Sequence, residues 1–275
     1  LSGGNTRRIF NNDFINDIYI DNSAILDGFT LKDGSAIDGG AMKLVNASPT
    51  LSNLIFLSNT SIGSSNGGAI YCIASSPKIE KCKFISNTSG MYGGAIINLS
   101  NSTPIILNSL FTQNSANKGG AIFAAQNSSY SLVNSTLYEN TAQSGGAAYH
   151  IGSGTIPNIF NNIIYGNSSS IVNTDSSSAR MEQNLIQGIT NDSLNYDFDP
   201  MFTNPTMGDY TLQESSPAIN QGENQFVKDV ETDIELALDL NHQPRIFDYY
   251  NNGIVDLGAF EYQGQKCSAA SRAYV

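Results

Sequence analysis

The sequence contains no tryptophan, and only 13% of its 275 residues are charged. Arginine is absent between residues 39 and 170, where Glu80 and Glu139 are the only acidic side chains. The formal net charge is −11, and a surface of that sign repels nucleic-acid phosphates and acidic lipids. Nucleic acid is therefore excluded as an expected partner.

Cysteine and long apolar runs are also scarce. The three cysteines are too few for a disulfide framework, and Cys72 and Cys82 are expected to pack as small apolar side chains in strands. No apolar run has the length of a membrane-spanning helix, and no signal peptide is visible. Because Leu1 already lies in repeat-like sequence, we expect further coils before it.

A Gly-Gly-Ala motif, usually followed by a large apolar residue, recurs five times at steps of 28, 26, 26 and 26 residues. Glycine adopts positive φ without strain and leaves room for a neighbouring backbone, so each pair is expected at a turn where successive coils crowd. The glycines are Gly39, Gly40, Gly67, Gly68, Gly93, Gly94, Gly119, Gly120, Gly145 and Gly146.

A second motif, Phe-x-x-Asn or a close variant, keeps step with the first. Equivalent asparagines in stacked coils are expected to form a ladder, each side-chain amide bonding to its copy one coil away. The asparagines of this ladder are Asn59, Asn87, Asn114, Asn140 and Asn167. A second ladder, interrupted by Lys81, is expected at Asn53, Asn108, Asn134 and Asn161.

The apolar runs within each repeat have the length of strands, and none has helical periodicity. We therefore predict an all-β fold, a right-handed parallel β-helix of about 26 residues per coil, with a smaller, irregular C-terminal module. Residues 39–170 carry a net charge of +3 and residues 171–275 one of −11. The expected divisions are a repeat array (1–170), final coils with an acidic module (171–262) and a tail outside the fold (263–275).

The alternation of the two motifs over residues 25–167 resembles the repeats of chlamydial polymorphic outer-membrane proteins and related bacterial β-helix surface proteins. The resemblance implies a bacterial protein that is secreted or displayed on the cell surface, associated with the outer membrane. It also implies an extracellular adhesin or scaffold that binds glycans or other cell surfaces. It brings no catalytic residues with it.

Two further resemblances lie towards the C-terminus. Residues 173–262, with Asp199-Pro200-Met201-Phe202 and Val255-Asp256-Leu257-Gly258-Ala259-Phe260-Glu261-Tyr262, are similar to the choice-of-anchor module that follows many bacterial β-helices. Residues 258–272 resemble the segment of 1-pyrroline-5-carboxylate dehydrogenases in which the residue at Cys267 is the nucleophile. No dinucleotide-binding pattern accompanies that cysteine, so we expect no dehydrogenase activity.

Parallel β-helices also act as polysaccharide lyases and glycoside hydrolases, which need paired carboxylates or calcium with a base. Glu80 and Glu139 are more than two coils apart, and His150 is alone, so it is expected to be structural. We predict no catalytic residues and no organic cofactor, and favour a monomeric interaction protein. A carbohydrate-active enzyme with its site in residues 171–260 and a purely structural stalk stay open as alternatives.

Calcium is the one ion for which the sequence offers candidate ligands. Acidic residues two apart share a face of an extended segment, although a solvated acidic edge explains them as well. The candidates are Asp197, Asp199, Asp229, Glu231, Asp233 and Glu235. Aromatic residues also recur near the turns and could stack on sugar rings or on each other; they are Tyr71, Tyr92, Phe123, Tyr149 and Tyr165.

Overall fold

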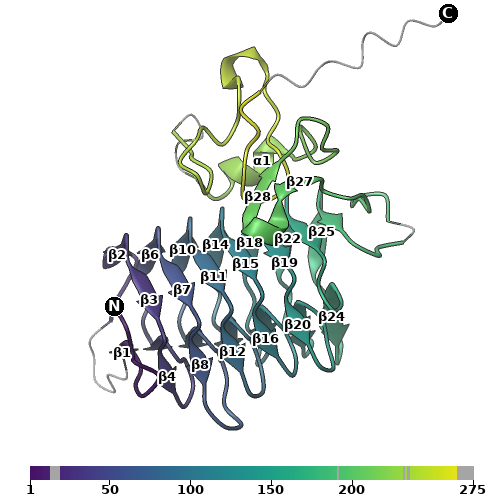
Figure 1. Ribbon diagram of the computed structural model, residues 1–275. Helices are drawn as coiled ribbons and strands as arrows, with labels where there is room; N and C mark the ends of the chain where they lie inside the picture. The colour runs from purple at the N-terminus through teal and green to yellow at the C-terminus, as the bar shows by residue number, and fades with distance from the viewer. Residues whose placement is uncertain (13–18, 191, 232, 234–235, 265–275) are drawn as a thin grey trace, which may run out of the picture.

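The computed structural model describes residues 1–12, 19–190, 192–231, 233 and 236–264. The chain forms a parallel β-solenoid of about six turns with about 26 residues per turn (Figure 1). The expected all-β class and parallel β-helix are thus confirmed. The only α-helix in the described part of the chain is α1 (Asn224–Lys228), so no described helix is long and apolar enough to cross a membrane.

Three seven-stranded parallel sheets run along the solenoid, each built from one strand per coil. The first sheet contains β1 (Phe10–Asn12), β5 (Met42–Val45), β9 (Ile70–Ile73), β13 (Ile96–Leu99), β17 (Ile122–Ala124), β21 (Ala148–Ile151) and β24 (Ile171–Thr174). The second contains β2 (Ile25–Asp27), β6 (Thr50–Ser52), β10 (Lys78–Glu80), β14 (Ile105–Leu107), β18 (Ser131–Val133), β22 (Asn158–Phe160) and β25 (Arg180–Glu182).

The third sheet contains β3 (Thr30–Lys32), β7 (Ile55–Leu57), β11 (Lys83–Ile85), β15 (Leu110–Thr112), β19 (Thr136–Tyr138), β23 (Ile163–Tyr165) and β26 (Leu185–Ile186). A shorter fourth sheet contains β4 (Ser35–Ala36), β8 (Thr60–Ser61), β12 (Thr88–Ser89), β16 (Ser115–Ala116) and β20 (Thr141–Ala142). The two-residue strands of this sheet lead into the Gly-Gly turns, which return the chain to the first sheet.

The centre of the solenoid is filled by side chains that repeat from coil to coil. Phe56, Phe84 and Phe111 occupy equivalent positions in the third sheet, and their rings stack with centroids 4.6 Å apart and planes within 1°. The next two coils place Leu137 and Ile164 in the same row. The core is therefore continuous along the axis, as stacking of incomplete units requires.

The Gly-Gly turns show why both positions favour glycine. Gly67 has φ of +64°, and a Cβ at Gly68 would lie 2.1 Å from the carbonyl oxygen of Gly94 in the next coil. The first glycine has positive φ in four of the five motifs, and Gly145 is the one that departs from this conformation. The second glycine thus allows close approach between coils, whereas the first allows the chain to turn.

The expected second ladder is wrong at the positions predicted for it. Asn53, Lys81, Asn108, Asn134 and Asn161 all have positive φ, at the corner between the second and third sheets. The side-chain oxygens of Asn53, Asn108 and Asn134 are buried and have no hydrogen-bond partner among the described residues. Asparagine recurs there because it tolerates the left-handed conformation better than most residues do.

A row of polar side chains does exist at this corner, one residue further along. The backbone N–H of Cys82 donates to Ser109 Oγ, that of Ser109 to Ser135 Oγ, and that of Ser135 to Asn162 Oδ1. Asn184 and Asn195 continue the row to the last coil and are joined to it in the same way.

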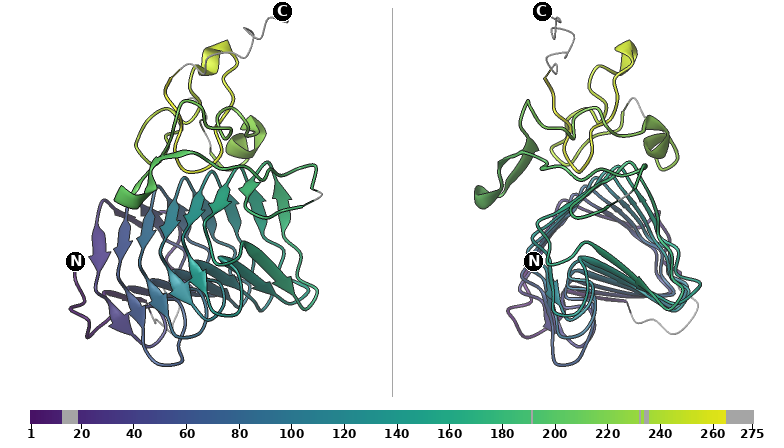
Figure 2. Two further views of the ribbon diagram at one scale, coloured as in Figure 1. Left: turned by 45° about the vertical axis from the view of Figure 1, so that its right-hand side comes forward. Right: turned by 90° about the vertical axis from the view of Figure 1, so that its right-hand side faces the viewer.

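After the last coil the chain folds back along the outside of the solenoid (Figure 2). This C-terminal module contains the antiparallel pair β27 (Phe202–Asn204) and β28 (Asp209–Leu212), the 3-10 helices η1 (Pro205–Met207) and η2 (Tyr249–Asn251), and α1. Side chains of β27 and β28 pack on Leu110 and Ile163 of the third sheet, and Phe226 of α1 stacks on Phe160 of the second. The module therefore straddles the corner between two sheets.

Candidate ligand-binding cleft

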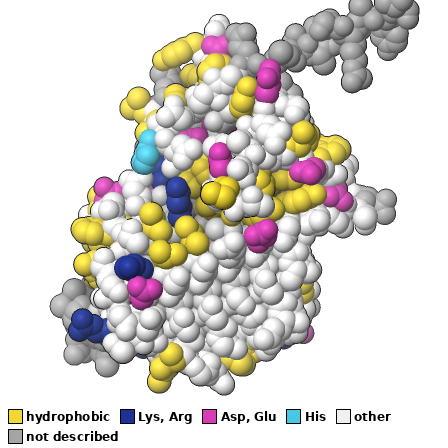
Figure 3. All heavy atoms as spheres, viewed as in Figure 1, with side chains coloured by type: hydrophobic (Ala, Val, Ile, Leu, Met, Phe, Trp, Pro, Cys, Tyr) yellow, Lys and Arg dark blue, Asp and Glu magenta, His cyan; other side chains and the backbone are white. Residues whose placement is uncertain are grey.

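A cleft of about 460 Å³ lies where the module meets the third sheet. Its floor is the outer face of β11 and β15, and its wall comes from η1, β28 and the segment around Phe260. Figure 3 shows hydrophobic side chains gathered along this junction, with basic side chains at its margin. The volume falls within the range of about 300–1,000 Å³ that is usual for small-molecule sites.

Strand alternation produces the floor of the cleft. Phe84 and Phe111 point into the solenoid, so their neighbours Lys83, Ile85 and Leu110 point outwards. The module covers Leu110 and leaves Lys83 and Ile85 partly exposed. The cleft thus lies at the margin of the module, between the third and fourth coils of its floor sheet.

The wall is anchored by a long-range polar contact. The hydroxyl of Tyr210 lies 3.0 Å from Thr112 Oγ1, and both side chains are buried. Tyr210 also packs at right angles to Phe202 and at a tilt against Tyr138. These contacts hold β28 against the solenoid, so the cleft is preformed.

The rim of the cleft carries polar and charged groups. Asp209 Oδ1 accepts hydrogen bonds from the backbone N–H and the hydroxyl of Thr211. Asn241 and Gln113 are exposed at the opening. Lys83 forms no ion pair with a described residue, because no acidic oxygen among the described residues lies within 4.0 Å of Lys83 Nζ. An apolar floor with a few convergent polar groups is typical of a ligand site.

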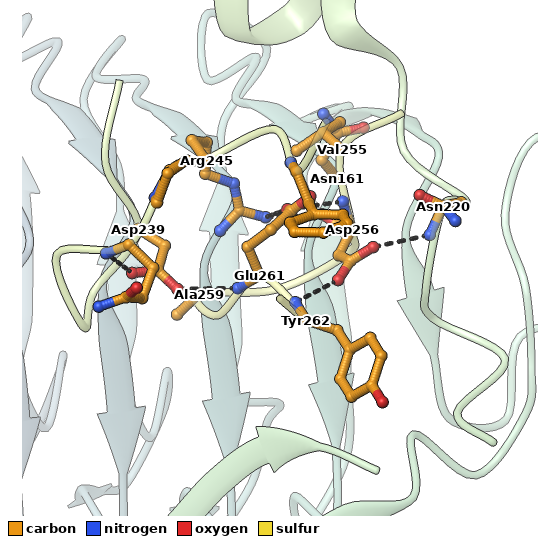
Figure 4. Close-up of polar contacts among 12 residues, drawn as sticks. Asn161, Asn220, Asp239, Arg245, Val255, Asp256, Ala259, Glu261 and Tyr262 are labelled. Atoms are coloured by element: carbon orange, nitrogen blue, oxygen red, sulfur yellow. Dashed lines mark hydrogen bonds and ion pairs between the residues drawn. The ribbon is translucent and has the colours of Figure 1, made fainter. Parts of the chain in front are cut away.

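A buried network of charged side chains lies behind this wall (Figure 4). Arg245 Nη2 donates to the carbonyl of Asp256 at 2.7 Å and lies 3.5 Å from Glu261 Oε2. Glu261 accepts hydrogen bonds from the backbone N–H groups of Phe247 and Asp256, and Asp239 accepts one from the N–H of Glu261. Burial raises the pKa of Glu261, while the guanidinium of Arg245 acts to lower it.

This network is a framework and not a reaction centre. Arg245 is fully buried, and Asp239, Asp256 and Glu261 are each exposed by 6% or less, so no substrate reaches them. Their bonds hold the two segments that carry Asn241 and Phe260 into the cleft wall. Residues 255–262 belong to the segment that resembles the choice-of-anchor module, but no spacing in the sequence predicted this ionic network.

The asparagines expected to form the main ladder lie in one buried row inside the solenoid. Asn59 Nδ2 donates to Asn87 Oδ1 at 2.9 Å, and the same bond recurs between Asn87 and Asn114, then onward to Asn140 and Asn167. Each Oδ1 also accepts the backbone N–H of the preceding asparagine in the row. Each Nδ2 also donates to a backbone carbonyl of the neighbouring coil, so these amide groups are occupied inside the solenoid and are not available to an external ligand.

The structure does not bring the described calcium candidates together into one site. Glu231 lies 3.8 Å from Lys78, which also pairs with Glu80 at 2.7 Å. Asp229 accepts from the side chain of Gln225, and Glu235 lies outside the described residues. No group of three or more His, Cys, Asp or Glu side chains suited to a metal occurs among the residues described. Calcium binding stays an untested prediction.

The recurrent aromatic residues stack mainly on each other. Tyr92 lies parallel to Phe123 with centroids 4.5 Å apart, and Phe123 lies parallel to Tyr149 at 5.7 Å. Tyr71, Phe123 and Tyr149 are each less than a tenth exposed. Tyr165 belongs to the cluster under the module. Of the two interpretations left open by the sequence, stacking between coils is therefore the one that the geometry favours.

His150 is fully buried between two polar partners. Its Nδ1 lies 2.7 Å from Asn173 Oδ1 and its Nε2 lies 2.7 Å from the hydroxyl of Tyr130. An amide oxygen only accepts, so Nδ1 carries the proton and Nε2 accepts from Tyr130. Burial lowers the pKa of His150 to about 4. A neutral, enclosed imidazole of this kind is structural, as expected from the sequence.

The cysteines offer no accessible nucleophile in the described chain. Cys72 and Cys82 are buried and free, and burial raises the pKa of each thiol to about 12. Both pack in the solenoid core, as expected for small apolar side chains. Cys267 and most of the expected tail lie outside the described residues.

The fold defines a parallel β-helix built from Phe-x-x-Asn and Gly-Gly-Ala repeats. The family model for the Chlamydia polymorphic membrane protein repeat matches residues 53–73 and 108–125. Each match runs from the corner residue through a third-sheet strand, a ladder asparagine and a Gly-Gly turn into the first sheet. The expected similarity to this repeat is thus confirmed. No curated protein and no solved structure matches the chain at a significant level. The choice-of-anchor and dehydrogenase resemblances stay predictions.

Proposed function

We propose that this protein is a surface-displayed bacterial adhesin that binds a glycan in the cleft between its solenoid and its C-terminal module. The match to a repeat of Chlamydia polymorphic membrane proteins supports exposure at a bacterial surface, associated with the outer membrane. The cleft is the observation that carries the binding role. The expected monomeric state is part of the proposal.

The chemistry of the cleft suits a sugar better than an apolar ligand. The partly exposed side chain of Ile85, backed by the buried Leu110 and Phe260, offers an apolar surface for the C–H face of a pyranose ring, and the rim offers amide, carboxylate and ammonium groups for its hydroxyls. The ladder and the stacked core make the solenoid a rigid support. A preformed site on such a support loses little conformational entropy on binding.

An array of immobilised glycans tests the proposal with the full chain. We expect retention on at least one glycan, and loss of that retention in Asn241→Trp, whose bulky side chain fills the opening of the cleft. Asn22→Trp is the matched control, because Asn22 is exposed in a turn remote from the cleft. Equal retention by both variants would place binding elsewhere and contradict the proposal, as would the absence of retention on every glycan.

A further inference from the structure

We infer that the cleft selects an acidic sugar, a uronate, whose carboxylate binds Lys83. The inference rests on the proposed function and narrows it to one substrate class. It begins from the charge distribution of the chain. Residues 39–170 contain five lysines and no arginine, so the cations that face any one surface of the solenoid are few and can be considered singly.

No acidic side chain among the described residues balances the charge of Lys83. Its register partners on either side are Ile55 and Leu110, so apolar side chains flank it along the row. Other lysines have partners: Lys32 lies 3.6 Å from Asp33, and Lys78 pairs with two glutamates. Within the described chain, Lys83 has no such acid and lines the cleft. A ligand carboxylate placed there gains a charge-assisted hydrogen bond beside an apolar floor.

The other charged group of the cleft limits where the negative charge of a ligand can lie. Asp209 lines the hairpin side and is held by Thr211. The carboxylate of Asp209 can accept hydrogen bonds from sugar hydroxyl groups, but it repels a second negative charge. The cleft therefore fits a sugar with its acidic group towards Lys83 and its hydroxyls towards Asp209, a polarity that a neutral sugar does not need.

The floor continues beyond the cleft in one direction. Ile55 and Leu57 of β7 are partly exposed and pair in register with Lys83 and Ile85. Figure 1 shows β3 and β7 uncovered by the module, so the third sheet stays open towards its N-terminal end. A chain of several uronate units has room to run along the solenoid axis from the cleft across β7.

Calorimetric titration of the full chain with trigalacturonate, its methyl ester and xylotriose tests this selection. The methyl ester keeps the shape of the uronate and removes its charge. We expect trigalacturonate to bind at least about tenfold more tightly than the other two, the ratio that about 1.4 kcal/mol of charge-assisted bonding gives. Binding of the methyl ester as tight as that of the acid overturns the inference.

Substitutions at Lys83 provide the second arm. Lys83→Gln should lower the affinity for trigalacturonate about tenfold and leave the affinity for xylotriose unchanged. Lys83→Arg should retain the preference for trigalacturonate over xylotriose. Lys118→Gln, beside Tyr149 of the first sheet and outside the cleft, is the matched control. Equal losses in Lys83→Gln and Lys118→Gln overturn the inference. Neutral-sugar binding that Asn241→Trp abolishes, without a preference for the acid, rejects the inference and preserves the proposed function. No binding of any sugar rejects both.

Discussion

Replacing Asn114 with leucine removes one rung from the middle of the buried ladder. Asn114 Nδ2 donates to Asn140 Oδ1 and to the carbonyl of Phe84, each at 2.9 Å. Its Oδ1 accepts the backbone N–H and the Nδ2 of Asn87 at 3.0 and 2.9 Å. Leucine has a similar volume and fulfils none of these roles. The substitution therefore leaves two donors of Asn87 buried without an acceptor.

The expected loss of stability follows from those orphaned groups. A buried donor deprived of its partner costs roughly 1–3 kcal/mol, so two of them cost about 2–6 kcal/mol. The added apolar surface of leucine offsets only a small part, because the solenoid interior at this point is lined by amides and backbone. A loss of this size is large compared with the total stability of about 5–15 kcal/mol that is usual for folded proteins.

Urea unfolding followed by circular dichroism measures the effect. The midpoint concentration is the quantity to compare, because repeat proteins do not always unfold in two states. Asn22→Leu is the control, since Asn22 is exposed in a turn and its side chain forms no hydrogen bond within the described residues. A midpoint for Asn114→Leu equal to that of the control would refute the view that the ladder stabilises the solenoid.

Three further outcomes are expected. Burial lowers the pKa of His150 to about 4 from the 6.5 usual for an exposed imidazole, so the free energy of unfolding should fall by about 3 kcal/mol as pH drops from 6.5 to below 4. His150→Gln should lack this part of the pH dependence of urea midpoints. Arg245→Leu should lower the free energy of unfolding by about 3–5 kcal/mol, because it leaves Glu261 buried without its cation. Adding Glu261→Gln should recover part of that free energy in a double-mutant cycle, and fully additive effects would argue against the ion pair. Cys72 and Cys82 should resist a thiol reagent at pH 8 until urea unfolds the chain, and labelling at the native rate of a free thiol would contradict their burial.

The repeat period predicted most of the solenoid because each coil places equivalent residues at equivalent points. Phe56, Phe84 and Phe111 are separated by one repeat, and the structure stacks them directly. Sequence reasoning succeeded here because a solenoid couples each coil only to its neighbours. A local pattern then contains almost all the information that the local structure needs.

The second corner shows where such reasoning fails. Asparagine recurs at Asn53, Asn108 and Asn134 for its backbone conformation, whereas the polar row passes through the following residue. Lys81 was the signal that could have revealed this, because a lysine cannot join an amide ladder but does share the positive φ. In the polar row that does form, Ser109 and Asn162 both accept a backbone N–H from the preceding coil, although their side chains differ. No single residue type therefore recurs in the sequence to mark this row.

The cleft could not be predicted from local patterns. Thr112 and Tyr210 are 98 residues apart, and their contact depends on how the module folds back over the solenoid. No pattern in the sequence connects Asp209-Tyr210-Thr211 to a partner on the third sheet. Lys83 has no distinguishing sequence context. We propose a role for Lys83 because it lines the cleft and no described acidic side chain pairs with it.

The ladder has a consequence for how the length of this molecule can change. Each asparagine presents to the next coil the same donors and acceptors that it receives from the previous one. Excising residues 88–114 would join Asn87 to Ser115 and bring Asn87 against Asn140 with every amide still bonded. The ladder itself therefore tolerates the loss or duplication of a whole coil, although a coil that carries Leu110 and Thr112, as this one does, would also lose its contacts to the module. The length of the solenoid is then adjustable in increments of about 4.8 Å, the spacing of paired strands.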